Sequence, residues 1–257
     1  MNRIKQLFRD KKDILSIYYT AGYPNLNDTV PILETLEDAG ADIVEIGIPF
    51  SDPLADGPTI QHSGETALKN GMSLNVLFDQ LKDVRSKVKM PLILMGYINT
   101  VHKFGIETFA KKCNEVGVDG VILPDLPFQE YLDNYKDTFD QYGVSNIFLI
   151  TPQTPEERIK LIDEKTNGFI YMVSSAAVTG AKKGLSEAQL AYFDRVNKLN
   201  LQNPALIGFG IGDHESYKET CKYADGAIVG SAFVKLLGQA KDLHGEIKSF
   251  IKEVKGI

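Results

Sequence analysis

Short apolar segments alternate with helix-like segments along the whole chain, and this alternation constrains the fold more than any other feature. The apolar segments are rich in β-branched residues and mostly uninterrupted, which is typical of parallel strands covered by helices. Eight strand–helix units in 257 residues match the size of a (β/α)8 TIM barrel. A doubly wound sheet is the alternative, but it would have fewer strands and a phosphate-binding loop after the first strand.

The expected elements follow an amphipathic extra helix at the N-terminus, over residues 1–10. The expected strands are Ile14–Tyr19, Ile43–Ile48, Pro91–Tyr97, Gly120–Leu123, Asn146–Ile150, Phe169–Val173, Ala205–Gly208 and Ala227–Val229. The expected helices are Leu26–Ala39, Leu74–Val88, Ile106–Val116, Glu130–Tyr142, Pro155–Lys165, Ser186–Leu199, Glu215–Tyr223 and Ala232–Leu237. Because no Pro- or Ser-rich linker interrupts this series, we expect a single domain over residues 1–257.

Composition and charge argue against several classes of protein. The chain is 43% hydrophobic, and its net charge of −6 offers no basic surface for nucleic acid. We expect no membrane association, because no apolar run approaches the roughly 20 residues that cross a bilayer. The N-terminal segment lacks the apolar core of a signal peptide, and the distant Cys113 and Cys221 suit free thiols in the cytoplasm. No metal is expected, because Asp52 and Asp56 lack a third ligand.

A carboxylate lies inside the apolar run of the second expected strand. An unpaired charge in a buried strand is costly unless a partner or a reaction uses it. The two-residue period of a strand places Ile43, Glu45 and Gly47 on one face, so Glu45 points the same way as a residue without a side chain. We therefore predict an active-site strand with room for a ligand beside Glu45. A buried ion pair is the structural alternative.

Polar and aromatic residues follow other strands at the end where TIM barrels carry their active sites. The second strand leads into a loop rich in Pro and Gly that contains Asp52 and Asp56. Turn formation explains either aspartate alone. Because both follow Glu45 closely in sequence, the three carboxylates together indicate acid/base chemistry. Tyr97 and Tyr171 end strands and are either core residues or the walls of a pocket for a planar ring. Asp125 is either a functional carboxylate or a loop cap.

Glycine-rich junctions follow the seventh and eighth expected strands, at 208–213 and 230–231. Glycines let backbone amides approach an anion, and a helix N-terminus adds free N–H groups, so these junctions predict a phosphate site. A long segment of small and polar residues, 174–184, predicts a mobile lid. The residues alone therefore indicate a barrel enzyme that acts on a phosphorylated small molecule through carboxylate acid/base chemistry.

The motif from Glu45 to Gln61 resembles the corresponding motif of the tryptophan synthase α subunit family. The resemblance covers essentially the whole chain and includes the segments 20–24, 124–127, 178–180, 208–211 and 229–231. It implies a lyase that cleaves indole-3-glycerol phosphate to indole and glyceraldehyde 3-phosphate by a retro-aldol reaction, without a cofactor in this chain. The expected reaction is the penultimate chemistry of L-tryptophan biosynthesis.

The resemblance also implies roles for individual residues. Glu45 is expected to be the general acid/base, and Asp56 the base toward the indole N–H. Thr179 in the lid is expected to close onto Asp56. The expected phosphate contacts are Gly180, Phe209, Gly210, Gly230 and Ser231, and the expected pocket residues are Tyr18, Tyr97, Asn99, Asp125 and Tyr171.

The same resemblance implies a partner, a pyridoxal-phosphate β subunit, in an αββα heterotetramer. One alternative is another phosphate-binding barrel, such as a sugar-phosphate isomerase or an indole-glycerol-phosphate-forming synthase, but no strand here ends in Lys. A second alternative is a ligand-sensing activator of the β subunit with weak chemistry of its own. Many relatives have Arg and Gly where this chain has Ser175 and Ala177, a difference that concerns the lid and leaves the chemistry in place.

Overall fold

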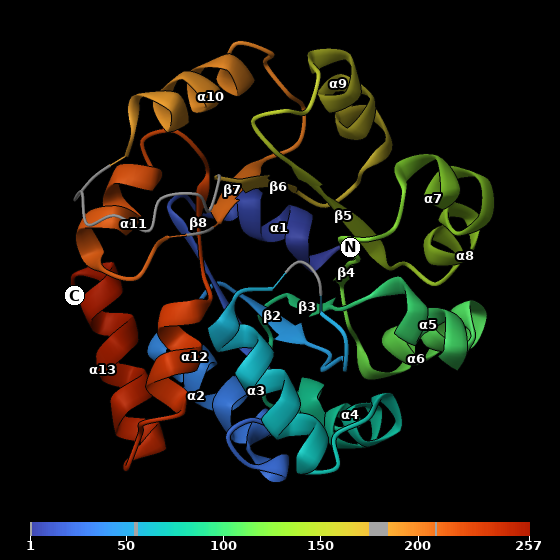
Figure 1. Ribbon diagram of the computed structural model, residues 1–257, viewed down its shortest axis with the longest axis vertical. Coiled ribbons are helices and arrows are strands. Elements are labelled where there is room, and N and C mark those ends of the chain that lie inside the picture. Colours follow the sequence, from blue (N-terminus) through green and yellow to red (C-terminus); the bar gives the residue numbers. More distant parts are fainter. Residues whose placement is uncertain (1, 54–55, 175–184, 209) are drawn as a thin grey trace.

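The computed structural model describes residues 2–53, 56–174, 185–208 and 210–257 (Figure 1). Within these residues, eight parallel strands form a closed barrel in which each strand pairs with the next and β8 pairs with β1. The strands are β1 (Ile14–Thr20), β2 (Ile43–Gly47), β3 (Leu92–Met95), β4 (Gly120–Ile122), β5 (Ser145–Ile150), β6 (Ile170–Val173), β7 (Ala205–Gly208) and β8 (Gly226–Val229). The TIM barrel predicted from the alternating segments is confirmed.

The helices surround the barrel, except for the N-terminal helix, which lies across one end of it (Figure 1). They are α1 (Arg3–Asp10), α2 (Thr29–Ala39), α3 (Pro58–Lys69), α4 (Leu74–Leu81), α5 (Ile98–Phe104), α6 (Ile106–Val116), α7 (Phe128–Asn134), α8 (Lys136–Gln141), α9 (Glu156–Lys165), α10 (Glu187–Asn197), α11 (His214–Thr220), α12 (Ser231–Leu237) and α13 (Leu243–Lys255). The expected N-terminal helix is α1, and the helix expected over 130–142 is divided at Tyr135 into α7 and α8. None of the described helices is both long enough and apolar enough to span a membrane.

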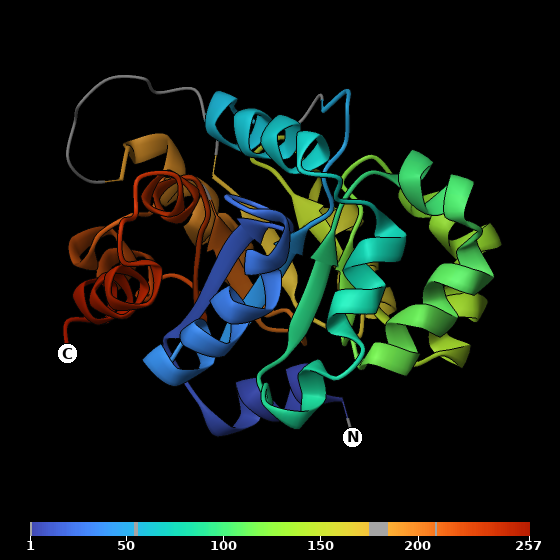
Figure 2. The ribbon, with the colours of Figure 1, turned by 90° about the horizontal axis from the view of Figure 1, so that it is seen from below.

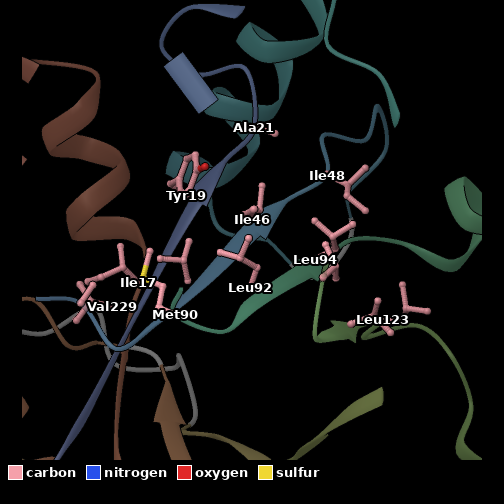
Figure 3. Close-up of a cluster of buried hydrophobic side chains, with 14 of the residues drawn as sticks. Ile17, Tyr19, Ala21, Ile46, Ile48, Met90, Leu92, Leu94, Leu123 and Val229 are labelled. Carbon is pink, nitrogen blue, oxygen red and sulfur yellow. The ribbon is translucent and has the colours of Figure 1, made fainter. Parts of the chain in front are cut away.

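Strand side chains form two buried groups, because successive residues in a strand point to opposite faces. Ile17, Ile46 and Leu94 point outward and belong to the larger core between the strands and the helices (Figure 3). The barrel interior is a separate and mainly isoleucine-lined core. Its buried members are Ile4, Ile14, Ile43, Ile93, Ile122, Ile147, Phe169, Tyr171, Leu206 and Ile228. Glu45 lies on the same face of β2 as Ile43, and Tyr18 lies on the same face of β1 as Ile14. Both side chains therefore point into this interior.

Helix α1 closes the barrel at the amino-terminal ends of the strands. Ile4 is fully buried among the interior side chains, and the rings of Phe8 and Phe169 lie 5.9 Å apart between centroids. Arg3 Nη1 forms a 2.9 Å ion pair with Asp119 Oδ1, which ties the helix to the loop before β4. Figure 2 shows α1 at one end of the barrel and α3 at the other. With one end closed, access to the interior is left to the carboxyl-terminal ends of the strands, where the candidate residues lie.

Candidate active site

Glu45 is fully buried inside the barrel on β2, in register with Tyr18 of β1 and Ile93 of β3. Its Oε1 accepts a 2.8 Å hydrogen bond from Ser16 Oγ, whereas Oε2 has no hydrogen-bond partner in the described structure. Burial raises the pKa of Glu45 to about 7, and the hydrogen bond from Ser16 opposes this rise. A carboxyl group with a pKa near neutrality can serve as both acid and base. Neither carboxyl oxygen of Glu45 contacts a cationic side chain among the described residues. The buried ion pair considered as the structural alternative is therefore not formed there.

The space at Gly47 is not open, which corrects the expectation that this glycine leaves room for a ligand. A Cβ atom on Gly47 would collide with the hydroxyl group of Tyr18, so the glycine makes room for a side chain from the neighbouring strand. The period of one strand shows which residues share a face, but it does not show how far a residue on the next strand reaches. Burial, followed by the nearby charge of Asp56, raises the pKa of Tyr18 well above its ordinary value. Its hydroxyl therefore stays protonated and can donate a hydrogen bond.

Asp56 lies near the mouth of the barrel, at the start of the described chain after the β2 loop. The Tyr97 hydroxyl donates a 3.0 Å hydrogen bond to Asp56 Oδ2. Tyr97 also stacks on Phe50, with ring centroids 5.0 Å apart and an interplanar angle of 28°. Burial raises the pKa of Asp56, and the Tyr97 hydrogen bond counteracts that rise. The contact brings the second candidate carboxylate together with two aromatic rings.

Tyr171 enters the same interior from β6. A Cβ atom on Gly208 of β7 would collide with the Tyr171 hydroxyl, so a glycine again makes room for a tyrosine. Burial raises the pKa of Tyr171 well above its ordinary value, and the charge of Glu45 adds to the rise. Tyr18 and Tyr171 therefore lie on either side of the interior around Glu45, as neutral hydroxyl donors at neutral pH.

A small cavity of about 20 Å³ lies among these residues, enough for about one water molecule. Its lining combines Tyr18, Asp56 and Tyr97 with the apolar Ile48, Met95, Gly96 and Pro124. A wider depression of about 370 Å³ adjoins it through Pro124, between the ends of β4 and β5 and helices α7 and α9. The Arg158 guanidinium carbon lies 4.3 Å from the centroid of the Phe128 ring at this depression. The carboxyl-terminal end of the barrel thus has a small polar pocket beside a larger, mixed one.

Asn99 and Asp125 lie outside the buried group. Asp125 Oδ1 accepts a 2.9 Å hydrogen bond from the backbone N–H of Ile98, the first residue of α5. This contact is a capping role, which was one of the two interpretations of Asp125. Asn99 is exposed in the first turn of α5. Neither side chain has a described hydrogen bond to Glu45 or Asp56.

The two glycine-rich junctions expected to bind phosphate lie next to each other. A Cβ atom on Gly212 would come within 3.0 Å of the Ala232 side chain, which places the β7 loop against the start of α12. Gly230 precedes α12 and contacts the side chain of Tyr18, and Ser231 is the first residue of that helix. Gly210 has a φ of +81°, a conformation that glycine adopts without strain. Thr179, Gly180 and Phe209 lie outside the described residues, as do Ser175 and Ala177.

Ser16 bonds to Glu45, and Phe50 stacks on the Tyr97 ring that bonds to Asp56; sequence reasoning missed both residues. Ser16 is the one polar residue between Ile14 and Tyr18 on the inward face of β1, so the strand period that identified Glu45 also placed it inside. The stacking of Phe50 on Tyr97 depends on the path of the loop and has no local signal. Among the described residues, no group of His, Cys, Asp or Glu is arranged to hold a metal ion.

A TIM barrel with one buried and one half-buried carboxyl group near the carboxyl ends of its strands has the features of barrel enzymes, whose active sites lie at that end. The family model of the tryptophan synthase alpha chain matches residues 4–255. The tryptophan synthase alpha chain of Flavobacterium johnsoniae is 56% identical over 255 residues, which cover 99% of this chain and 100% of that relative. The chain therefore belongs to the tryptophan synthase alpha chain family.

Solved structures agree with this assignment. The crystal structure of the tryptophan synthase alpha chain from Legionella pneumophila superposes with a TM-score of 0.89 at 33% identity, covering 100% of this chain and 97% of that one. A chain from the tryptophan synthase α2β2 complex of Pyrococcus furiosus superposes with a TM-score of 0.88 at 36% identity, covering 96% and 99%. The family's reaction is the cleavage of indole-3-glycerol phosphate, and the chain is accordingly a lyase of tryptophan biosynthesis.

Proposed function

We propose that Glu45 and Asp56 carry out the retro-aldol cleavage of indole-3-glycerol phosphate to indole and glyceraldehyde 3-phosphate. The observation that supports this most is Glu45 itself, a fully buried carboxyl with one oxygen bonded to Ser16, the other without a partner among the described residues, and a pKa of about 7. A group with such a pKa exchanges protons in either direction at neutral pH. Positioned acid/base groups of this kind contribute on the order of 10²–10⁴-fold each to the rate.

The proposed reaction begins with protonated Glu45, which gives its proton to indole C3. The ring becomes a cation, and the carboxylate of Asp56 takes the proton from the ring nitrogen. The Glu45 carboxylate then removes the proton from the substrate hydroxyl, a carbonyl forms, and the bond between C3 and the glycerol carbon breaks. The electron pair of that bond enters the ring, the nitrogen recovers its proton from Asp56, and Glu45 is again protonated.

The aromatic residues supply the proposed binding site for the indole ring. Tyr97 donates to Asp56 and stacks on Phe50, so the same contact holds the base and presents flat apolar surface. Tyr18 and Tyr171 line the interior beside Glu45 and are proposed to contact the substrate. Asn99 and Asp125 are proposed as more distant pocket residues, and Thr179 as the lid residue that covers Asp56.

The proposed phosphate site is formed by the junctions after β7 and β8. Gly210, Gly230 and Ser231 would offer backbone N–H groups and a hydroxyl to the phosphate, and Gly180 and Phe209 are proposed to complete it. The adjacency of Gly212 and Ala232, which brings the two junctions together, supports this site. Backbone amides bind phosphate without a basic side chain, and neither junction contains one.

We further propose that the chain works as one cytoplasmic domain without a cofactor of its own, in an αββα assembly with a pyridoxal-phosphate β subunit. The solved α2β2 complex of Pyrococcus furiosus tryptophan synthase, which is described as mutually activated, supports such a partnership. A role as ligand-sensing activator of the β subunit, with feeble chemistry of its own, is the second candidate. It would coexist with the lyase reaction if an isolated chain turns over slowly.

Indole release from indole-3-glycerol phosphate tests these proposals. The purified chain would be assayed alone and with increasing amounts of a cognate β subunit, beside the variant Asp56→Asn. We expect turnover that rises as β subunit is added, and a loss of about 10²-fold or more in the variant. Turnover that stays flat as β is added would refute the partner's activation. A folded wild-type chain that releases no indole under either condition would refute the proposed chemistry and leave the activator role.

A further inference from the structure

The Ser16 hydroxyl group is hydrogen-bonded to Glu45 in the barrel interior. Ser16 is fully buried on β1, and its Oγ lies 2.8 Å from Glu45 Oε1. In the strand register Ser16 pairs with Ile43, whereas Tyr18 pairs with Glu45, so Ser16 lies one inward-facing position closer to the amino ends of the strands. Its other paired neighbour is Ile228 of β8. Ser16 is therefore a polar residue in an otherwise apolar layer, and its hydroxyl bonds to the carboxyl group beside it.

We propose that Ser16 is the positioning residue of Glu45: its hydroxyl fixes Oε1 and leaves Oε2 as the oxygen that exchanges protons with the substrate. The inference rests on the acid/base role proposed for Glu45. The two carboxyl oxygens of Glu45 differ in their contacts, and this difference supports the inference. Oε1 accepts a hydrogen bond from the buried Ser16 hydroxyl, whereas Oε2 has no hydrogen-bond partner in the described structure. A carboxyl group held at one oxygen keeps one orientation while the other oxygen gains and loses its proton.

A serine hydroxyl suits a group that changes protonation during each turnover. It can donate to a carboxylate oxygen, and the carbonyl oxygen of a protonated carboxyl accepts the same hydrogen bond. The hydrogen bond therefore persists whether Glu45 is protonated or ionised. An ammonium or guanidinium partner would instead strongly favour the ionised carboxylate. An alanine at this position would leave both carboxyl oxygens of Glu45 without the described donor.

Removing the hydroxyl changes the protonation of Glu45 in a predictable direction. The hydrogen bond lowers the pKa of Glu45 against the larger effect of burial, so Ser16→Ala raises that pKa. The titratable groups that interact with Glu45 are Tyr18 of β1 and Tyr171 of β6, and the charge of Asp56 acts on both tyrosines. Both tyrosines have raised pKa values and stay neutral through the range of the assay. A shift in the alkaline limb of the rate profile therefore reports Glu45.

The test uses the full chain with its β subunit and compares Ser16→Ala with Ser16→Thr. The matched control is Ser63→Ala, because Ser63 is also fully buried and its Oγ lies 2.6 Å from Thr20 Oγ1, with no described hydrogen bond to Glu45. The kcat and KM for indole release would be measured from pH 5 to pH 9. The pKa of Glu45 would be followed separately by ¹³C NMR of labelled glutamate, with Glu45→Gln to assign the signal.

We expect Ser16→Ala to keep KM within about threefold, to lose about tenfold in kcat, and to move the alkaline limb and the NMR titration up by about one pH unit. Ser16→Thr keeps a hydroxyl and should recover most of the rate, and Ser63→Ala should leave both titrations in place. A folded Ser16→Ala variant with the wild-type titration and kcat would overturn the inference about Ser16. Undiminished turnover of Glu45→Gln would instead overturn the acid/base role, and the two failures are thereby distinguished.

Discussion

Replacing Glu45 by Gln should stabilise the folded chain in a pH-dependent way. The buried carboxyl has a pKa of about 7 in the folded state, against 4.5 in an ordinary environment. The folded chain therefore retains a proton that the unfolded chain releases in this range. The sign follows from linkage: the stabilising contribution is fully present below pH 4.5 and is lost as pH rises through 7. Glutamine has no proton to lose, so the variant lacks this dependence.

The size of the effect follows from the shift in pKa. Each pKa unit corresponds to about 1.4 kcal/mol, so the charged, buried Glu45 costs about 3 kcal/mol at pH 8. Between pH 5 and pH 8 the free energy of unfolding of Glu45→Gln should rise by about 2 to 3 kcal/mol relative to that of the wild-type chain. Ser16 can still donate its hydrogen bond to the amide oxygen of the variant, so loss of that contact does not enter the comparison.

Urea unfolding of the two chains at pH 5, 6, 7 and 8 measures this difference. Glu157→Gln is the control for the exchange of a carboxyl for an amide group, because Glu157 is exposed on α9. Contributions from other titrating groups, including Asp56, are common to both chains and largely cancel. Parallel stability curves for wild type and Glu45→Gln would refute the reasoning, because they would mean that the folded carboxyl titrates in its ordinary range.

Three further outcomes follow from the site. The kcat for indole release should be bell-shaped in pH, with an alkaline limb near 7 from the loss of the Glu45 proton and an acid limb where Asp56 becomes protonated. Tyr97→Phe removes the donor to Asp56, so the acid limb should move to higher pH, with about tenfold lower kcat; an unmoved limb would count against that contact. Gly47→Ala should cost about 1–3 kcal/mol in urea unfolding through collision with the Tyr18 hydroxyl. Adding Tyr18→Phe to Gly47→Ala should recover part of the lost stability. If stability does not recover, the strain does not come from the Tyr18 hydroxyl.

Strand positions were well predicted from the sequence, because β-branched apolar runs have few alternatives to a covered parallel sheet. The third strand is shorter than predicted: it ends at Met95, and Tyr97 precedes helix α5. Helix α3 was absent from the prediction, since its sequence reads as the end of a Pro- and Gly-rich loop. It begins with Pro58 at its first position, which is a favourable start for a helix.

The interior of the barrel was only partly predictable. The two-residue period placed Glu45 and Gly47 on one face of β2, and the structure agrees. The same period gave no information on which residues of the neighbouring strands lie opposite Glu45 and Gly47, because one strand's pattern does not set the register. Tyr18 therefore occupies the space beside Gly47, and Ser16 becomes the partner of Glu45. Contacts between strands depend on register, which local pattern does not encode.

Contacts made by loops were the least predictable. Asp125 could be assigned to either capping or chemistry until its hydrogen bond to the Ile98 N–H was known. The pairing of Tyr97 with Asp56 joins two loops 41 residues apart in sequence. The adjacency of the two glycine-rich junctions was anticipated, because the ends of consecutive parallel strands meet at one edge of a barrel.

The central claim is that Glu45 transfers the protons that break the carbon–carbon bond. Its most direct test is a single-turnover experiment with Glu45→Gln in the presence of the β subunit, measuring the substrate dissociation constant and the rate of indole formation separately. We expect a dissociation constant within a few-fold of wild type, since glutamine has nearly the same shape, and a rate lower by about 10³-fold or more. A cleavage rate near that of the wild-type chain would contradict the account.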